Sequence, residues 1–304
     1  MTTQRPALSK DDVDAFHRSL SNWGRWGERD QLGTLNLITA EKRVAAARLV
    51  RSGRSVGCAR PLPTEPAPDN PQPVVHLMTG TATEGWGGDY LALAPHGFAT
   101  SHIDALCHIF HEGKLYNGYP IDRVTAHGAL DLGIHELRHG VVSRGILLDI
   151  PQARGVDFLA PGEPIFVDDL ERAESGGAVR VDPGDVVLLR TGRWRARKAL
   201  GPRPVADGLA GLDASCLPWL HERGVAALGC DGVSDVLPSR VADTPLPVHS
   251  VAIVTMGLHL IDNLELDDLA EACRAEGRIE FQLTIAPLVV KRGTASPVNP
   301  IALF

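Results

Sequence analysis

The sequence contains no long hydrophobic run. No stretch reaches the roughly 18 uncharged apolar residues that a membrane-spanning helix requires. Residues 1–14 are polar and charged, so they lack the apolar segment of a secretory signal peptide. From these two absences we expect a cytoplasmic protein that has no membrane partner.

Cysteine is scarce and never closely spaced. The chain has five cysteines and no C-x-x-C pair: Cys58, Cys107, Cys216, Cys230 and Cys273. A disulfide framework requires a dense and even set of cysteines, and a thiolate zinc site requires closely spaced pairs. The sequence therefore excludes both, and we expect reduced thiols that are mostly buried.

Basic residues are fewer than acidic residues. Lysine and arginine total 30 against 37 acidic residues, which gives a formal net charge of -7, and no basic run stands out from this background. A nucleic-acid-binding protein needs a concentrated basic surface that neutralises phosphates. Nucleic acid is therefore excluded as the main partner.

The chain of 304 residues, 44% of them hydrophobic, is long enough to bury a large core. Segments rich in branched residues predict strands at 141–150, 184–191, 225–230 and 279–290. Capping residues and helical periodicity predict helices at 39–53, 166–175, 213–223, 248–256 and 266–273. Six prolines between positions 61 and 73 predict an extended surface loop. The mixture indicates an α/β or α+β fold.

Two familiar signatures occur in contexts that do not suit them. Residues 53–57 read G-x-S-x-G, but a nucleophile elbow follows a strand, whereas this segment follows the predicted helix at 39–53. Residues 135–139 read H-E-x-x-H, a zinc pattern that requires a long helix. Gly133 and Gly140 leave room for little more than one turn, so we interpret this segment as a solvated connecting turn.

A third cluster has the spacing of metal ligands. His102, Asp104 and His108 form an H-x-D-x-x-x-H pattern. If the chain passes from strand to helix near Asp104, then Asp104 and His108 share one helical face, and His102 converges on them from the strand. Such ligands suit Zn²⁺, Mn²⁺ or Fe²⁺ without selecting among them. From spacing alone, a hydrogen-bonded structural cluster is an equal alternative.

The residues around this cluster resemble a known family. Segment 96–119, which includes H-I-D-A-L-C-H at 102–108, resembles the H-x-G-T-H-x-D-x-x-x-H signature of the cyclase family, to which bacterial kynurenine formamidase and isatin hydrolase belong. The likeness extends over most of the chain, with ordered matches at 144–149, 182–192, 229–235 and 260–264. Several ordered matches are more specific than any one of them.

The resemblance implies a metal-dependent hydrolase that opens an amide, lactam or related acyl bond of a small molecule by metal-activated water. It implies a barrel-like mixed β core flanked by helices, forming a single domain over residues 1–304 in which residues 1–53 are an N-terminal helical extension. The expected partners are a small-molecule substrate and further copies of the chain, as a homodimer or homotetramer.

The resemblance also implies the roles of individual residues. His102, Asp104 and Asp262 correspond to ligands of one divalent metal ion, zinc or manganese, while His108 and His249 correspond to catalytic positions. One of these two histidines is expected to relay a proton to the leaving group. By the same analogy, three polar residues after the predicted strand at 225–230 are expected near the pocket: Asp231, Ser234 and Asp235.

One residue departs from the family signature. The first histidine of the signature falls on Phe98, which cannot bind a metal, so we expect one ion rather than two. His96 is a candidate replacement, but in an extended strand it would lie about 20 Å from His102, at about 3.3 Å per residue. Only a bulge between the two histidines would bring His96 back to the site.

Phe98 also motivates an alternative function. In this alternative the protein is a metal-independent cyclase or dehydratase of natural-product metabolism, with His108, His249 and Asp104 as acid and base. A catalytically inactive binding or scaffold protein is a further alternative, which the intact set of His102, Asp104 and His108 argues against. Metal content separates the hydrolase from the metal-independent enzyme.

Overall fold

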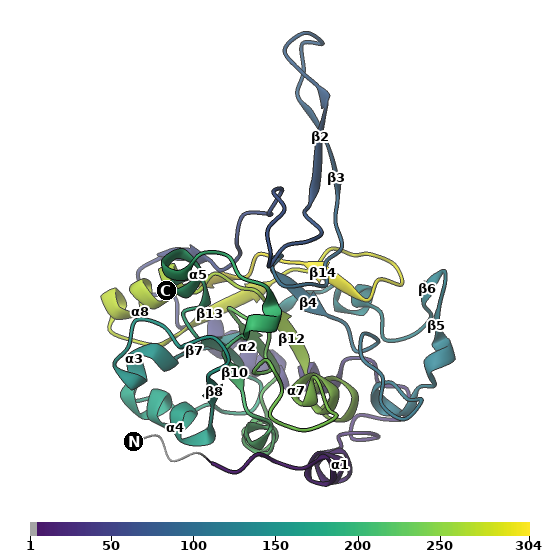
Figure 1. The fold of residues 1–304 in the computed structure, drawn as a ribbon, viewed down its shortest axis with the longest axis vertical. Coiled ribbons are helices and arrows are strands. Elements are labelled where there is room, and N and C mark those ends of the chain that lie inside the picture. The colour runs from purple at the N-terminus through teal and green to yellow at the C-terminus, as the bar shows by residue number, and fades with distance from the viewer. Residues whose placement is uncertain (1–4) are drawn as a thin grey trace.

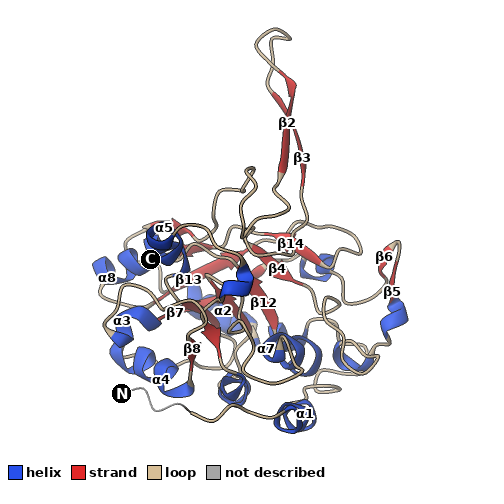
Figure 2. Cartoon of the chain, in the orientation of Figure 1, coloured by secondary structure: helices blue, strands red, loops and turns tan. Residues whose placement is uncertain are grey.

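The computed structural model describes residues 5–304, which fold around a curled mixed sheet flanked by helices (Figures 1 and 2). In the described residues the sheet has nine strands, in the order β1-β15-β13-β7-β9-β11-β12-β4-β14. Their bounds are β1 Ser55–Gly57, β4 His102–Asp104, β7 Val141–Asp149, β9 Val186–Arg190, β11 Ala227–Cys230, β12 His259–Asp262, β13 Glu280–Ile285, β14 Ala295–Pro297 and β15 Ile301–Leu303. The fold class predicted from the sequence is confirmed.

The centre of the sheet is parallel and its two sides are antiparallel. β7, β9, β11 and β12 run parallel to one another, whereas β13 and β4 pair antiparallel with the outer members of this group. Every residue of β9 is buried, as expected for a parallel strand covered on both faces. β13 alternates between buried and partly exposed residues, which is typical of a strand with one covered face.

The helices pack around this sheet. The α-helices are α1 Lys10–Ser19, α2 Ala40–Ala47, α3 Ile150–Arg154, α4 Val167–Gly176, α5 Arg193–Leu200, α6 Leu217–Glu222, α7 Pro247–His249 and α8 Asp267–Glu276. A π-helix, η7 Ser250–Met256, continues directly from α7. Short 3-10 turns are η1 Gly33–Leu37, η2 Tyr116–Gly118, η3 Ile121–Arg123, η4 Ile134–Leu137, η5 Val205–Asp207 and η6 Ala214–Cys216. The two N-terminal α-helices pack against later elements: α2 contacts β7, and α1 contacts η7.

Most elements predicted from the sequence are present, with differences in extent or type. The helix predicted at 39–53 ends at Ala47. The Thr39 hydroxyl caps α2 as expected, accepting a hydrogen bond from the Lys42 amide at 3.2 Å. The predicted strand at 279–290 ends at Ile285, because Pro287 has no amide hydrogen for the ladder. The helix predicted at 248–256 is present, but most of it has π-helical pairing. The H-E-x-x-H segment forms the short turn η4, as interpreted from its flanking glycines.

A long hairpin rises from the body of the molecule. β2 Val75–Gly80 pairs antiparallel with β3 Gly88–Ala92, and we call residues 75–92 the arm. Figure 1 shows the arm standing clear of the sheet and helices, above β4 and β14. The proline-rich segment 61–73 leads into it as an irregular loop, as predicted, whereas the arm itself was not predicted. In the described residues two smaller strand pairs complete the fold: β5 Val124–Thr125 with β6 Gly128–Ala129, and β8 Pro164–Ile165 with β10 Gly211–Leu212.

All five cysteines are free and buried, which confirms the expectation of unpaired thiols. Among the helices described for residues 5–304, none is long and apolar enough to cross a lipid bilayer.

Candidate functional site

The candidate site lies on β4 and β12, where strand register brings three predicted residues to one face. His102 and Asp104 are two residues apart on β4, so their side chains project on the same side of the sheet. Asp262 on β12 is paired directly opposite His102, which places it on that side too. All three residues are buried. Two short strands therefore assemble the three residues predicted to be metal ligands.

The chain does not continue from Asp104 into a helix, so that part of the sequence prediction is wrong. The Ala105 amide donates to the Thr294 carbonyl at 2.9 Å, which keeps the backbone tied to the segment before β14. A tight turn follows, closed by a 3.0 Å hydrogen bond from the His108 amide to the Ala105 carbonyl. The turn still brings His108 back to the site, because its ring stacks on that of His96 at 3.7 Å.

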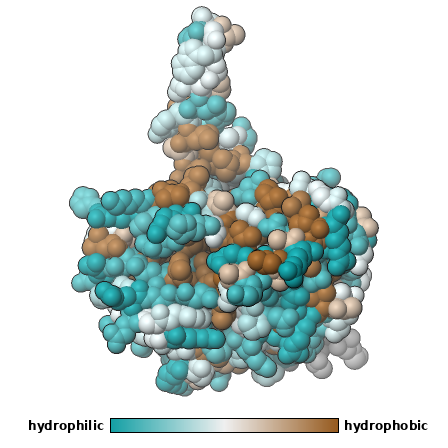
Figure 3. Space-filling model, turned by 180° about the vertical axis from the view of Figure 1, so that it is seen from behind, coloured by the Kyte–Doolittle hydropathy of each residue, from teal (hydrophilic) through white to brown (hydrophobic). Residues whose placement is uncertain are grey.

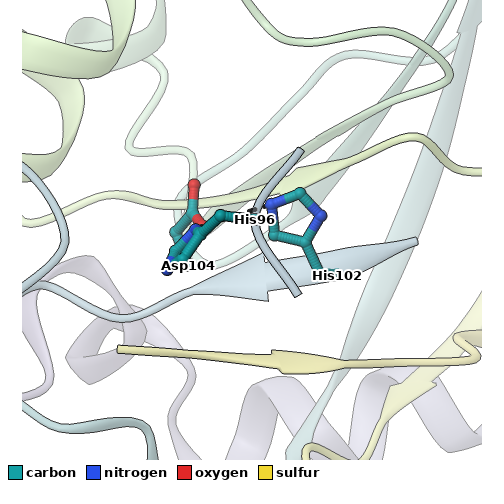
Figure 4. Close-up of side chains that lie close together, drawn as sticks. All are labelled: His96, His102 and Asp104. Atoms are coloured by element: carbon teal, nitrogen blue, oxygen red, sulfur yellow. Dashed lines mark ion pairs between the residues drawn. The ribbon is translucent and has the colours of Figure 1, made fainter. Parts of the chain in front are cut away.

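His96 returns to the site through a bend, so the separation expected for an extended strand is wrong. Its Nδ1 lies 3.1 Å from Asp104 Oδ1, and its ring meets that of His102 edge to face at 5.5 Å. Figure 4 shows His96 entering from a separate segment to meet the two residues on β4. Gly97 has φ 145°, a value that side-chain-bearing residues rarely adopt, and it permits the bend.

Two buried polar side chains hold this bend in place. Asn263 donates through Nδ2 to the carbonyls of Gly97 at 2.9 Å and Thr100 at 3.1 Å. Arg193 donates to the Phe98 carbonyl and, at 2.6 Å, to Asn263 Oδ1. The segment thus presents the imidazole of His96 to the site and only the backbone of Phe98 to Arg193. Sequence reasoning missed Arg193 and Asn263, because their partners lie far away along the chain.

His249 completes a second group with two carboxylates. Its Nε2 lies 3.3 Å from Asp262 Oδ2 and 3.8 Å from Asp104 Oδ2. Two groups could therefore hold a metal ion, and in each the candidate ligand atoms lie within 4.8 Å of one another. One group is His96, His102 and Asp104, and the other is Asp104, His249 and Asp262. Asp104 belongs to both.

Hydrogen bonds fix the orientation of both imidazoles. Asp235 accepts from His249 Nδ1 at 2.6 Å and from the amides of Val248 and His249 at 2.7 and 3.0 Å. His102 Nδ1 lies 2.9 Å from the Thr100 carbonyl, to which it donates. Each bond leaves Nε2 directed at the carboxylates, which is the arrangement found around histidine ligands of metals.

Of the other residues that the sequence predicted near the pocket, Ser234 lies in the site and Asp231 lies outside it. Ser234 donates to Asp262 Oδ1 at 3.3 Å, so it belongs to the site. Asp231 instead accepts from the amides of Thr191, Gly192 and Arg193, where it anchors the start of α5. Its role is structural, consistent with the preference of helix N-termini for carboxylates.

Electrostatics in the site favour positive charge. Burial raises the pKa of Asp104, but the adjoining imidazoles of His102 and His96 outweigh burial and hold that pKa well below its usual value. Burial lowers the pKa of His102, yet Asp104 raises it to a net value of about 9. For His249, the carboxylates of Asp235 and Asp262 overcome burial and raise the pKa well above its ordinary value. By contrast, burial lowers the pKa of His108 to about 4, so His108 is neutral at pH 7.

Unpartnered atoms at the centre of the site fit a cation. Both carboxylate oxygens of Asp104 and Nδ1 of His96 are buried and have no hydrogen-bond partner of acceptable geometry. Burying a carboxylate without donors is unfavourable unless a cation accompanies it. Nitrogen and oxygen ligands of this kind suit zinc or manganese. The residues present therefore fit the metal that the sequence predicted.

A further histidine, which sequence reasoning missed, hydrogen-bonds to the backbone of β4. His259 on β12 is buried, and its Nδ1 lies 2.8 Å from the Asp104 carbonyl. Burial lowers the pKa of His259, which keeps the ring neutral. A neutral ring donates to that carbonyl and fixes the backbone that carries Asp104. The available signal was a lone histidine within an apolar strand, which sequence alone cannot distinguish from a core residue.

His17 on α1 holds the helix that carries His249. Its Nδ1 lies 2.5 Å from Thr255 Oγ1 and its Nε2 lies 3.1 Å from Ser250 Oγ. These hydroxyls are five residues apart on η7, and a π-helix places residues of that spacing on one face. The ring of His17 also stacks on His111 at 3.5 Å. His17 therefore ties η7 to the loop that follows the β4 turn.

We expect the His17→Ala variant to be less stable than the parent at pH 8 by about 2 kcal/mol, because two hydroxyls lose their partner. Burial, together with the charge of nearby His111, lowers the pKa of His17 to about 4 from 6.5. The unfolded chain therefore binds this proton more readily, and the stability that His17 contributes is complete above pH 6.5 and lost as the pH falls towards 4. Denaturant unfolding at pH 8 and pH 5 should show the difference between variant and parent shrinking at the lower pH. An equal difference at both pH values would contradict this assignment, and His139→Ala, at an exposed position, is the control.

Comparisons with known proteins find a matching family model and similar folds. The sequence model of the Cyclase family matches residues 60–235. A crystal structure described as a novel cyclase superposes with a TM-score of 0.86 and 30% identity, covering 94% of this chain and 100% of that chain. Isatin hydrolase A from Ralstonia solanacearum superposes with a TM-score of 0.57 and 22% identity, covering 87% of this chain and 97% of that one.

A structure described as a potential metal-dependent hydrolase with cyclase activity has a TM-score of 0.52 and 17% identity, covering 83% of this chain and 98% of that chain. No curated protein matches the sequence. The two matches below 25% identity support the fold alone.

Proposed function

This chain belongs to the cyclase family, and on that premise we propose that it is a metal-dependent hydrolase that opens an amide, lactam or related acyl bond of a small molecule. The observation that carries the proposal is Asp104, whose two buried oxygens lack hydrogen-bond partners while candidate ligands surround them. Structures described as isatin hydrolase and as a potential metal-dependent hydrolase share the fold, which supports the same class of reaction.

One divalent ion, zinc or manganese, would be held by Asp104 and Asp262 together with His102. His249 Nε2 and His96 Nδ1 lie close enough to the same carboxylates to complete the set. When bound, such an ion polarises a scissile carbonyl and lowers the pKa of water. The sequence places Phe98 where the family signature has its first histidine, and His96 supplies an imidazole beside Asp104 instead.

The chain's own residues would orient the site and move protons. Asp235 holds the ring of His249 with Nε2 directed at Asp262, and that contact ties His249 to the carboxylates. His108 has no such tie, and its low pKa keeps it neutral at pH 7. A neutral imidazole accepts a proton from water and returns it to the leaving group. We therefore assign the proton relay to His108 and an ion-binding or orienting role to His249.

One observation favours the metal-independent alternative. The Nδ1 atom of His249 lies 2.6 Å from Asp235, a pair that also occurs in acid–base catalysis without a metal. In that alternative a cyclisation or dehydration would use His249 as the acid and His108 as the base.

Metal content of protein purified without added metal or a histidine tag tests the proposal. We expect elemental mass spectrometry to find about one zinc or manganese per chain, and chelation to abolish hydrolysis of a panel of aryl formamides, lactams and lactones. The His102→Ala variant should lose both metal and activity while keeping its circular dichroism spectrum. His139→Ala, at an exposed position of the H-E-x-x-H segment, is the matched control and should keep both. Activity without metal would favour the alternative, and full metal content in His102→Ala would contradict the ligand assignment.

A further inference from the structure

A small cavity lies beside α5. Its walls come from α5, from the segment between α3 and β8, from the loop between α5 and β10, and from the proline-rich loop. The apolar part of the lining includes Leu159, Ala196, Leu200 and Leu209. No lining residue belongs to the arm, whose lower part and adjoining body carry the apolar side chains that gather in Figure 3. The cavity is therefore a feature of the body, separate from the arm.

The cavity has an excess of positive charge. In the described part of the chain, three arginines line it, Arg193, Arg197 and Arg203, together with one carboxylate, Asp69. Arg197 occupies that carboxylate, because its guanidinium donates to the two oxygens of Asp69 at 2.5 and 3.0 Å. Within residues 5–304, neither Arg193 nor Arg203 forms an ion pair. Two arginines of the lining thus lack a paired anion.

The charge of Arg193 is buried. Only 8% of the residue is exposed, and its guanidinium donates to neutral acceptors, Asn263 Oδ1 and the Phe98 carbonyl. The nearby carboxylate of Asp231 accepts instead from the backbone amides at the start of α5. A buried charge without a counter-ion is unfavourable. A guanidinium has more donors than these two bonds use, so an anion in the cavity would supply the missing counter-charge.

The volume and the lining select the kind of anion. The cavity has about 60 Å³ of free volume. One water molecule needs about 10–15 Å³ of such volume, so the cavity has room for about four to six non-hydrogen atoms. A carboxylate matches the planar fork of a guanidinium. Phosphate or sulfate would leave oxygen atoms against leucine side chains without donors, whereas the alkyl end of a short acid would pack against them. The observations therefore favour a short aliphatic monocarboxylate.

We propose that this cavity is a binding site for a short-chain monocarboxylate, held by Arg193 and Arg203, with its alkyl end against the leucine side chains. Arg193 also donates to the carbonyl of Phe98, two residues after His96. A carboxylate that fixes the guanidinium of Arg193 would therefore also tighten the segment that brings His96 to the candidate site. The binding does not depend on the proposed hydrolase activity, because the occupant pairs with arginines and not with a metal ion.

Calorimetric titration of the full chain with sodium propionate tests the binding. We expect a dissociation constant of about 1 mM or below, and at least about tenfold weaker binding of propionamide, which has the same size without the charge. Arg203→Gln removes one charge from the wall and should weaken propionate binding by about threefold or more. Ala196→Met fills the cavity and should abolish binding. Arg43→Gln, at an exposed position in α2, is the control and should bind like the parent.

Circular dichroism checks that each variant folds. A parent that binds no propionate, or that binds propionate and propionamide equally, would overturn the proposal. Full binding in both Arg203→Gln and Ala196→Met would place the carboxylate elsewhere, such as on a metal ion in the candidate site, and would overturn it too.

Hydrogen exchange measures the link from the cavity to His96. We expect propionate to slow the exchange of backbone amides in residues 97–101 by about fivefold in the parent and to have no effect in Ala196→Met. Exchange in the parent that stays unchanged with propionate bound would refute the link.

Discussion

The Asp104→Asn variant should no longer bind metal, and its activity should fall by at least about a thousandfold. It should also lose the part of its thermal stability that metal binding provides. The asparagine has the same shape but lacks the charge that a divalent ion requires, and an ion supplies several kcal/mol of transition-state stabilisation. A ligand present at a thousand times its Kd stabilises the folded state by about 4 kcal/mol. For a chain of this size that corresponds to roughly 6 °C in Tm.

Thermal unfolding with and without chelator measures this effect. The parent should lose roughly 6 °C on chelation, whereas the Asp104→Asn variant should show the same Tm in both conditions. Asp207→Asn, at an exposed position in η5, is the control and should respond like the parent. If Asp104→Asn kept a chelator-sensitive Tm, the ion would be bound elsewhere.

The Arg193→Met variant should be less stable by about 3–5 kcal/mol, because a methionine leaves the buried acceptors of a charged group without a donor. The guanidinium is buried, stacks over Trp194 at 4.3 Å and donates to Asn263 and to the Phe98 carbonyl. Burial lowers the pKa of Arg193 to about 10, and the group still carries its charge at pH 7. Loss of the guanidinium should also free the segment that positions His96 in the site.

Unfolding in urea measures the loss of stability. Metal titration by calorimetry measures the affinity for metal, which should fall when His96 is no longer held in position. We expect Arg193→Met to bind metal more weakly than the parent by tenfold or more, as is typical when support of a ligand is removed. Lys198→Met, on the exposed part of the same helix, should change neither quantity. Unchanged metal affinity in Arg193→Met would show that Arg193 stabilises the fold without positioning His96.

The central sheet was predictable because its strands carry a strong local signal. The run V-V-L-L at 186–189 and the alternation of Phe281, Leu283 and Ile285 reflect burial that each strand experiences along its own length. His102 and Asp104 were identified from the H-x-D-x-x-x-H spacing, although the helix predicted from Asp104 onward is absent and both residues lie on β4. Asp262 and His249 came from the resemblance, since no local pattern connects them to β4.

The position of His96 could not be predicted from local sequence. The bend depends on Asn263 and Arg193, which are distant in sequence and reach residues 97–100 only after β12 and α5 have packed. The turn after Asp104 likewise depends on Thr294, whose carbonyl accepts from Ala105. The arm escaped prediction because its strands are short, are bounded by glycines and lack a buried face that would produce a regular alternation.

Because every cysteine is buried, the native chain should react little with thiol-directed labels. Burial raises the pKa of Cys58, Cys107 and Cys273 to about 12, and raises that of Cys216 and Cys230 further above its ordinary value. A thiol in this state forms almost no thiolate at neutral pH and reacts slowly with maleimides. A single cysteine introduced at the tip of the arm would therefore take up a fluorophore or spin label selectively, and the motion of the arm could be followed without removing any natural cysteine.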